Sequence, residues 1–265
     1  DGGALSIFQY NNNVIIINST FSYSTASYGG GAISIDSYNS YIDIEGSTID
    51  HCNATGDEVD YDYYYGFVVN DGYGGGVSVY KNNHHINIVN SSFSHNAASY
   101  GGGGGVFMFE GNHHINIVRS TFSHNSGLWG GGIIIGMSNY HVNITLSTFS
   151  YNTASYYGGG VSMYEGNHHI NIVHSTFSHN SGIWGGGISI VMYNYHVHLT
   201  LSTFSYNTAS YGGGVSMYEN NHHVDIVNNT FSLNSGLLGG GIIIRRSNYH
   251  INITLSTFSY NTASY

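Results

Sequence analysis

The chain has 265 residues, enough for two ordinary domains or for one elongated repeat domain. It contains 38 Gly, 25 Tyr and no Pro, and only 7% of its residues are charged, against roughly 25% in ordinary globular chains. The net charge of −10, with only four Lys and Arg, excludes a basic surface for nucleic acid or for an anionic membrane, and the many aromatic and β-branched residues exclude a disordered chain.

Cysteine content and hydropathy limit further the classes of protein to which the chain could belong. Cys52 is the only cysteine, so we expect a buried, inert thiol and no disulfide within the chain. No run of about 18 apolar residues is present, so we expect no membrane span. The chain begins with Asp1 and has no basic-then-apolar leader, which indicates a processed mature chain or a part of a longer one.

Nine segments of the chain repeat one pattern. Each contains a cluster of small residues, mostly glycine, and a Phe or Ile that follows the last small residue by 17 positions. The pairs are Ala4/Phe21, Ala32/Ile49, Gly76/Phe93, Gly105/Phe122, Gly132/Phe149, Gly160/Phe177, Gly187/Phe204, Gly214/Phe231 and Gly241/Phe258. The sequence therefore predicts nine coils that share one ungapped core.

Within each segment the predicted elements follow in a fixed order. In the first, apolar residues alternate at Leu5 and Ile7 and again at Val14 and Ile16, a period of two that predicts two short strands with one buried face. Most segments are about 27 to 29 residues long, too short for a helical crossover between strands. We therefore predict a single all-β domain over residues 1–265, a single-stranded parallel β-helix (solenoid) of about nine coils.

An asparagine occupies one column of the repeat, between the two predicted strands. Asn tolerates left-handed backbone angles, and stacked amides can hydrogen-bond from coil to coil, so an asparagine ladder at a tight corner is expected. Its members are Asn11, Asn39, Asn83, Asn112, Asn139, Asn167, Asn194, Asn221 and Asn248.

This ladder resembles that of pectate-lyase-like right-handed parallel β-helices. "GGAL" at Gly2, "GGAI" at Gly30 and the "FSHN" and "FSYN" stretches, such as those at Phe93 and Phe149, are similar to the GGA[ILV] and FxxN repeats of polymorphic outer-membrane protein passengers. The resemblance implies a right-handed coil and a surface protein. No barrel-like run of alternating strands follows the repeats, so anchoring by such a barrel is not supported.

The second coil carries an insertion at about 53–73, and loops that leave a solenoid often carry recognition. The candidate recognition loop is acidic and rich in tyrosine: Asp57, Glu58, Asp60, Tyr61, Asp62, Tyr63, Tyr64 and Tyr65. Calcium binding is the alternative to a solvated or partner-binding loop, but the spacing lacks the EF-hand glycine and terminal glutamate, so we expect no calcium and no other cofactor.

Paired histidines recur as "HHINIV" and resolve into two columns. The second column is His in seven successive coils: His85, His114, His141, His169, His196, His223 and His250. We expect these rings to stack along the surface, with zinc or copper binding as the alternative, because a metal site needs converging ligands and a straight column offers a line. Charging neighbouring rings would lower their pKa values, so stability should fall at acidic pH.

Catalysis is not expected. Carboxylates outside the insertion are scattered, whereas polysaccharide hydrolysis needs a grouped pair. The column of Glu110, Glu165 and Glu219 also holds Lys81 and Arg246, which predicts exposed ion pairs between neighbouring coils.

Six N-x-[ST] sequons are candidate glycosylation sites, close to the number that this Asn, Ser and Thr content gives by chance. They lie at Asn18, Asn53, Asn90, Asn143, Asn228 and Asn252.

The two ends complete the functional hypothesis. "FSYNTASY" at the end followed by "DGGAL" at the start would reproduce the internal spacing from Phe149 to Gly158, so a second chain could continue the stack in register. We therefore predict a non-enzymatic extracellular or cell-surface protein that assembles head to tail with itself into a filament. The alternatives are an adhesin that uses the acidic loop to bind glycans or a cell surface, and a carbohydrate-active β-helix enzyme.

Overall fold

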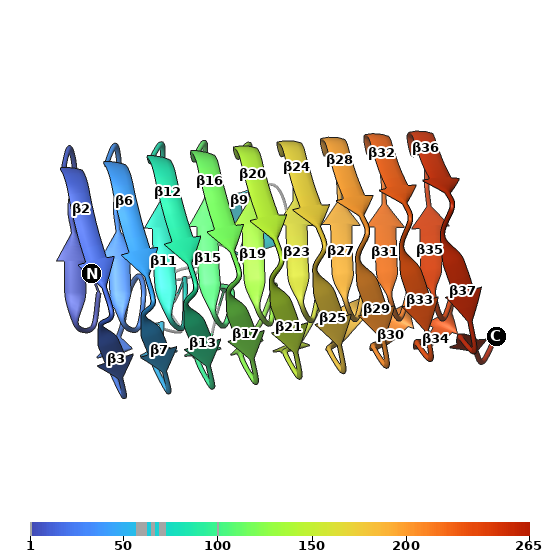
Figure 1. Ribbon diagram of the computed structural model, residues 1–265, viewed down its shortest axis with the longest axis horizontal. Coiled ribbons are helices and arrows are strands. Elements are labelled where there is room, and N and C mark those ends of the chain that lie inside the picture. Colours follow the sequence, from blue (N-terminus) through green and yellow to red (C-terminus); the bar gives the residue numbers. More distant parts are fainter. Residues whose placement is uncertain (1, 57–62, 65–66, 69–72, 100) are drawn as a thin grey trace.

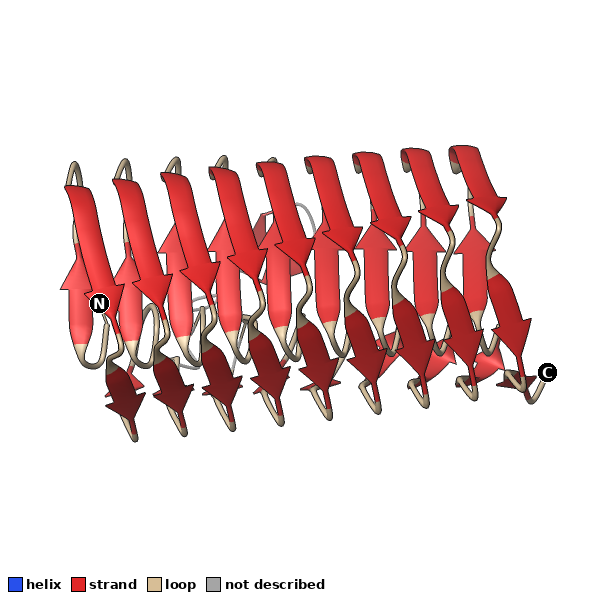
Figure 2. Ribbon diagram, in the orientation of Figure 1, coloured by secondary structure: helices blue, strands red, loops and turns tan. Residues whose placement is uncertain are grey.

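A computed structural model describes residues 2–56, 63–64, 67–68, 73–99 and 101–265. The chain winds into a straight stack of nine coils, with the two termini at opposite ends of the stack (Figure 1). Strands and the turns between them make up the described residues, as Figure 2 shows. Four strands from each coil pair with their counterparts in the coils on either side, which produces four parallel nine-stranded sheets along the stack.

Each sheet takes one strand from every coil. Sheet one contains β1 (Leu5–Ile7), β5 (Ile33–Ile35), β11 (Val77–Tyr80), β15 (Val106–Phe109), β19 (Ile133–Gly136), β23 (Val161–Tyr164), β27 (Ile188–Val191), β31 (Val215–Tyr218) and β35 (Ile242–Arg245). Sheet two contains β2 (Asn12–Ile17), β6 (Ser40–Glu45), β12 (His84–Val89), β16 (His113–Val118), β20 (Tyr140–Thr145), β24 (His168–Val173), β28 (Tyr195–Thr200), β32 (His222–Val227) and β36 (Tyr249–Thr254).

The other two sheets are built from shorter strands. Sheet three contains β3 (Thr20–Ser22), β7 (Thr48–Asp50), β13 (Ser92–Ser94), β17 (Thr121–Ser123), β21 (Thr148–Ser150), β25 (Thr176–Ser178), β29 (Thr203–Ser205), β33 (Thr230–Ser232) and β37 (Thr257–Ser259). Sheet four contains β4 (Thr25–Ala26), β8 (Asn53–Ala54), β14 (Ala97–Ala98), β18 (Ser126–Gly127), β22 (Thr153–Ala154), β26 (Ser181–Trp184), β30 (Thr208–Tyr211), β34 (Ser235–Leu238) and β38 (Thr262–Ala263).

The register between coils follows the predicted columns. Val106 pairs with Ile133, which pairs in turn with Val161, so apolar residues lie over apolar residues along this inward-facing column. Their side chains point inward and are fully buried, as are the matching Ile and Val residues of sheet two. The predicted all-β parallel solenoid of nine coils is confirmed.

The phenylalanine column forms an aromatic stack through the core. Phe149, Phe177 and Phe204 are fully buried, with ring centroids 4.8 and 4.9 Å apart and nearly parallel planes. A small residue must lie beside each ring, and in coils three to nine it is glycine: a Cβ on Gly160 would stand 2.8 Å from Cδ1 of Phe177 and 2.6 Å from the carbonyl oxygen of Gly187. This close approach explains why a small residue precedes each phenylalanine by 17 positions.

The predicted asparagine ladder is confirmed at the corner between sheets one and two. The backbone N–H and Nδ2 of Asn112 both donate to Oδ1 of Asn139 at 3.1 Å, and Nδ2 also donates to the carbonyl of Phe109 at 2.8 Å. Burying amides costs little folding free energy when all their hydrogen bonds are made, and these bonds hold each corner to the next.

Two further polar columns follow the same rule at the remaining corners. In one, Asn152 donates through its backbone N–H and Nδ2 to Oδ1 of Asn180, both at 3.0 Å. In the other, the backbone N–H of Ser120 donates to Oγ of Ser147 at 3.2 Å. The serine column escaped the sequence analysis, although a Ser or Asn two residues before each Phe or Ile signals it.

Coil two keeps the regular pairing beyond residue 53, where the insertion was predicted to begin. Asn53 and Ala54 pair with Thr25 and Ala26 below and with Ala97 and Ala98 above, so they belong to sheet four. The backbone N–H of Gly56 still donates to the coil below, at Ser27. The insertion therefore begins after Gly56 and not at residue 53.

A second apolar cluster covers the outer face of sheet one. Phe107, Ile134, Tyr164 and Val191 are at most 4% exposed, although their side chains point away from the main core. Trp129 and Tyr157 are among the aromatic residues that pack on them. Sheet one is therefore buried on both faces over the middle of the stack.

Candidate functional site

The seven histidines of the predicted ladder lie one above the next. Successive ring centroids are 4.7 to 5.1 Å apart, and Tyr41 stacks below His85 at 4.6 Å. His85 has a φ of +56°, and the pairing of β12 with β16 passes from His84 directly to Ile86. The second histidine therefore occupies a left-handed position inside the strand, where the pairing is interrupted and the ring turns to the surface.

The first histidine column runs beside it and mixes His with Tyr. His168 stacks on Tyr195 at 4.8 Å, and Tyr195 on His222 at 5.1 Å. Nδ1 of His84 lies 2.9 Å from Nδ1 of its neighbour His85, and the next coil repeats the contact. One ring donates and the other accepts, so each such pair is held together in its neutral form.

The environment of five of these rings disfavours their charged form. Burial lowers the pKa of His84 from its ordinary 6.5, and the charges that His85 and His114 would carry lower it further. The pKa values of four more histidines are lowered by the same two causes, with burial first: His113, His168, His169 and His223.

A third aromatic column, which the sequence analysis did not single out, follows sheet three. Its seven rings lie 4.6 to 5.0 Å apart: Tyr23, His51, His95, His124, Tyr151, His179 and Tyr206. The signal was present as the third residue of each "FSHN" or "FSYN" stretch. Every member has a positive φ, so the column marks another left-handed corner.

The predicted ion pairs form between neighbouring coils. Nζ of Lys81 lies 3.1 Å from Oε1 of Glu110, and Nη1 of Arg246 lies 3.1 Å from Oε2 of Glu219. Glu165 occupies the same column, but the coils on either side place Met137 and Met192 there. Burial raises the pKa of Glu165.

The sequons fall into two environments. Asn18, Asn53, Asn90, Asn228 and Asn252 are exposed. Asn143 is half-buried, and its amide takes part in a surface ladder: its Nδ2 donates to Asn116 at 3.0 Å, and its Oδ1 accepts from Asn171 at 2.9 Å. A glycan on Asn143 would replace one of the two hydrogens on its Nδ2.

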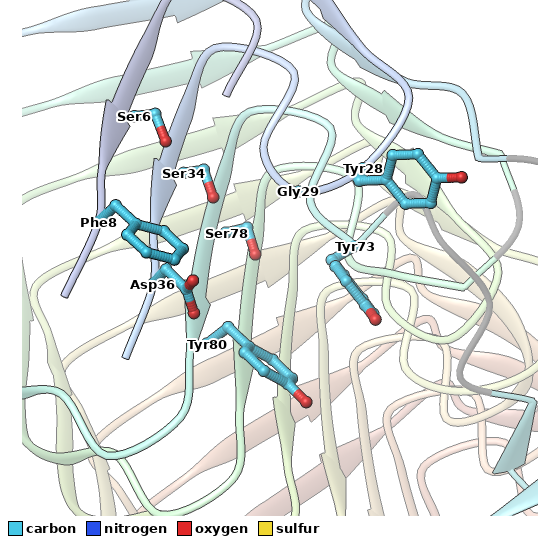
Figure 3. Close-up of a pocket in the computed structure, with 9 residues that line it drawn as sticks. All are labelled: Ser6, Phe8, Tyr28, Gly29, Ser34, Asp36, Tyr73, Ser78 and Tyr80. Atoms are coloured by element: carbon cyan, nitrogen blue, oxygen red, sulfur yellow. The ribbon is translucent and has the colours of Figure 1, made fainter. Parts of the chain in front are cut away.

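A hollow of about 200 Å³ opens on the outer face of sheet one near the start of the stack (Figure 3). Its floor is a row of serines from three successive coils, and its rim includes Asp36 and four aromatic residues. The serines are Ser6, Ser34 and Ser78, and the aromatic residues are Phe8, Tyr28, Tyr73 and Tyr80.

Small residues create this hollow. The floor column holds Phe107 and Ile134 in the next two coils, where the bulk fills the space. The covering column holds Gly29 here but Tyr157, Trp184 and Tyr211 higher in the stack. The hydroxyl of Ser78 is buried and has no hydrogen-bond partner among the described residues.

The candidate recognition loop lies largely outside the described residues, which omit Asp57, Glu58, Asp60, Tyr61, Asp62 and Tyr65. Tyr63 and Tyr64 form β9 (Tyr63–Tyr64), which pairs antiparallel with β10 (Phe67–Val68). The insertion therefore contains a short hairpin.

The geometry of the coils agrees with comparisons to known proteins. A family model described as the right-handed β-helix region matches residues 75–262. The chain belongs to the right-handed β-helix family. The match spans more than half of the chain and agrees with the predicted handedness. No curated protein matches the sequence.

Two solved structures resemble this right-handed β-helix. The Dettilon tailspike protein is 11% identical, with a TM-score of 0.49 over 98% of this chain and 55% of that one. PfbA, a surface adhesin of Streptococcus pneumoniae, is 12% identical, with a TM-score of 0.40 over 88% of this chain and 63% of that one. The chain thus spans less than two thirds of either protein. None of its described segments forms a helix with the length and apolar character needed to cross a membrane.

Proposed function

We propose that this right-handed β-helix is the structural unit of an extracellular filament, in which copies stack head to tail. The direction of the polar ladders supports this function. In every step the backbone N–H of one coil donates to the side-chain oxygen of the next coil, as from Asn11 to Asn39 and from Asn221 to Asn248. The ladders therefore have a head and a tail.

The two end faces present complementary halves of these ladders. Oδ1 of Asn11 and Oγ of Ser19 lie at the positions that accept from a preceding coil. The backbone N–H groups of Asn248 and Ser256 lie at the positions that donate to a following one. One copy placed on another would join acceptors to donors, which is a heterologous contact that repeats without closing.

The same contact would also cover apolar side chains of the last coil. Inward-column residues there are partly open, with Ile244 43%, Ile253 39% and Phe258 47% exposed, whereas Phe231 one coil earlier is fully buried. Covering these side chains with another coil would bury apolar area in addition to pairing sheet edges. Glycans on the exposed sequons would lie along the sides of such a filament.

Electron microscopy together with intact mass tests the proposal. The native protein should form filaments built from chains of about 29 kDa plus any glycan mass. Ile253→Lys, which places a charge on the end face, should abolish them. Leu255→Lys is the matched control: it adds the same charge to the same coil, at a residue 80% exposed, and should leave filaments intact. Isolated rods from the native protein, or filaments made of one much longer chain, would refute head-to-tail assembly.

A second candidate function is recognition of a saccharide at the hollow of Figure 3. Aromatic faces bind the C–H faces of sugar rings, and the carboxylate of Asp36 and the hydroxyl of Ser78 offer hydrogen bonds at the rim and floor. The volume suits one sugar ring. Binding to a glycan array that Ser34→Phe abolishes and Thr153→Phe retains would support this adhesin-like role, because Thr153 is exposed on sheet four, outside the hollow. Binding unaffected by Ser34→Phe would exclude this site.

A further inference from the structure

One carboxylate interrupts a column of serines. The last residue of each strand in sheet three is Ser in eight coils, but coil two has Asp50 there. Its neighbours in the sheet are Ser22 below and Ser94 above. A charged residue at this one step of the repeat is not needed for the coil itself, because the same corner forms with Ser elsewhere.

Asp50 lies between two imidazole rings of the third aromatic column. Its Oδ2 is 2.7 Å from Nδ1 of His51, and its Oδ1 is 3.3 Å from Nδ1 of His95, one coil further along. One oxygen and two nitrogens, all potential metal ligands, lie within 4.8 Å of one another. Such donors can converge on one ion through small side-chain rotations.

The surroundings hold these three groups in place. The rings of His51 and His95 stack on each other at 4.6 Å, and the rings of Tyr23 and His124 extend the stack on either side. The hydroxyl of Ser94 donates to Oδ1 of Asp50 at 2.6 Å. An oriented carboxylate and stacked rings reduce the entropy that a metal ion would have to remove on binding.

The site is accessible from solvent. The side chains of His51, Asp50 and His95 are 43%, 29% and 48% exposed, so an ion can enter and keep water ligands. Each ring can present an Nδ1 lone pair to a metal ion when its proton lies on Nε2.

We propose that Asp50, His51 and His95 bind a divalent transition cation, with zinc as the best fit. Two imidazole nitrogens and one carboxylate oxygen suit zinc and disfavour calcium or magnesium, which take oxygen ligands. Water occupies the remaining coordination position, where a ligand from outside the chain could replace it. The histidine ladder of sheet two differs because it has no carboxylate between its rings.

Calorimetric titration with Zn²⁺ at pH 7.5, repeated with Co²⁺ by visible absorption, tests the site on the full chain. The native protein should bind one equivalent more tightly than the rest of its histidines, with the Co²⁺ spectrum of a mixed nitrogen and oxygen site. Asp50→Ser restores the ordinary residue of the column, so it should fold normally and weaken that equivalent at least about tenfold. His95→Ala should also weaken the binding of that equivalent.

Two variants serve as controls because the chain has 17 histidines. His179→Ala removes a ring from the same column, between Tyr151 and Tyr206, and should leave the tight equivalent unchanged. His84→Ala tests the paired histidines of sheet two and should also leave it unchanged. A native titration without a tight equivalent, an Asp50→Ser protein that binds like the native one, or loss of the tight equivalent in either control would overturn the proposal.

Discussion

The backbone N–H and the side-chain Nδ2 of Asn96 donate to the same atom, Oδ1 of Asn125 in the next coil, at 3.0 Å each. Nδ2 of Asn96 also donates to the carbonyl of Ile49 in the coil before. Asn96 therefore joins three coils. Because one side chain satisfies backbone groups in more than one coil, a single substitution should disturb several hydrogen bonds at once.

Asn152→Ala should destabilise the protein strongly. The change removes the acceptor of Asn125 N–H and the donor to the carbonyl of Phe122, and leaves these buried groups unpaired. Each unpaired buried group costs about 1 to 3 kcal/mol, so we expect a loss of at least about 2 kcal/mol in the free energy of unfolding, measured in urea. Thr153→Ala, at the exposed neighbouring residue, should change it by less than about 0.5 kcal/mol. Equal losses in the two variants would contradict the ladder's role.

The phenylalanine stack gives a second prediction. Phe177→Ala opens a cavity between Phe149 and Phe204 and should cost about 3 to 5 kcal/mol, seen as a lower denaturation midpoint. Phe177→Ile should cost less, because Ile49 already occupies this column in coil two without exposure. If the isoleucine variant were as unstable as the alanine variant, ring stacking rather than volume would dominate.

Stability should fall as the solution is acidified. The folded pKa values of His84, His113, His168, His169 and His223 lie below their ordinary 6.5. The unfolded chain therefore takes up protons near pH 6.5, before the folded chain does, and stability is lost as pH falls from about 7.5 through that window. Thermal unfolding followed by circular dichroism should show a lower midpoint at pH 5 than at pH 7.5. A flat profile would mean that the rings do not interact.

Two glutamates of one column should respond oppositely to neutralisation. Burial raises the pKa of Glu165, so the unfolded chain ionises first and the residue lowers stability once pH rises above about 4.5. Glu165→Gln should therefore raise the unfolding midpoint at pH 7 and leave it unchanged near pH 4. Glu110→Gln removes the exposed pair with Lys81 and should cost less than about 1 kcal/mol, with a smaller effect in high salt. The same sign of change for both variants at pH 7 would contradict this assignment.

The sequence by itself determined the number of coils, the buried columns and the asparagine corner. These features are visible because the repeat length is nearly constant: a residue and its partner in the next coil share a column whether or not the structure is known. Period-two alternation at Val14 and Ile16 assigned one face of sheet two to the core by local geometry alone.

Only the tertiary structure decided which polar groups meet. Sheet four escaped prediction because strands of two residues, such as Thr25–Ala26, carry no readable period. The left-handed position of His85 depends on a backbone angle that the alternation does not encode. Asp50 and His95 lie 45 residues apart because the insertion separates their coils, yet closing the stack over that insertion brings their side chains within 3.3 Å. Repeat spacing assigns columns, whereas side-chain rotamers and the path of the insertion set the contacts that could bind a ligand.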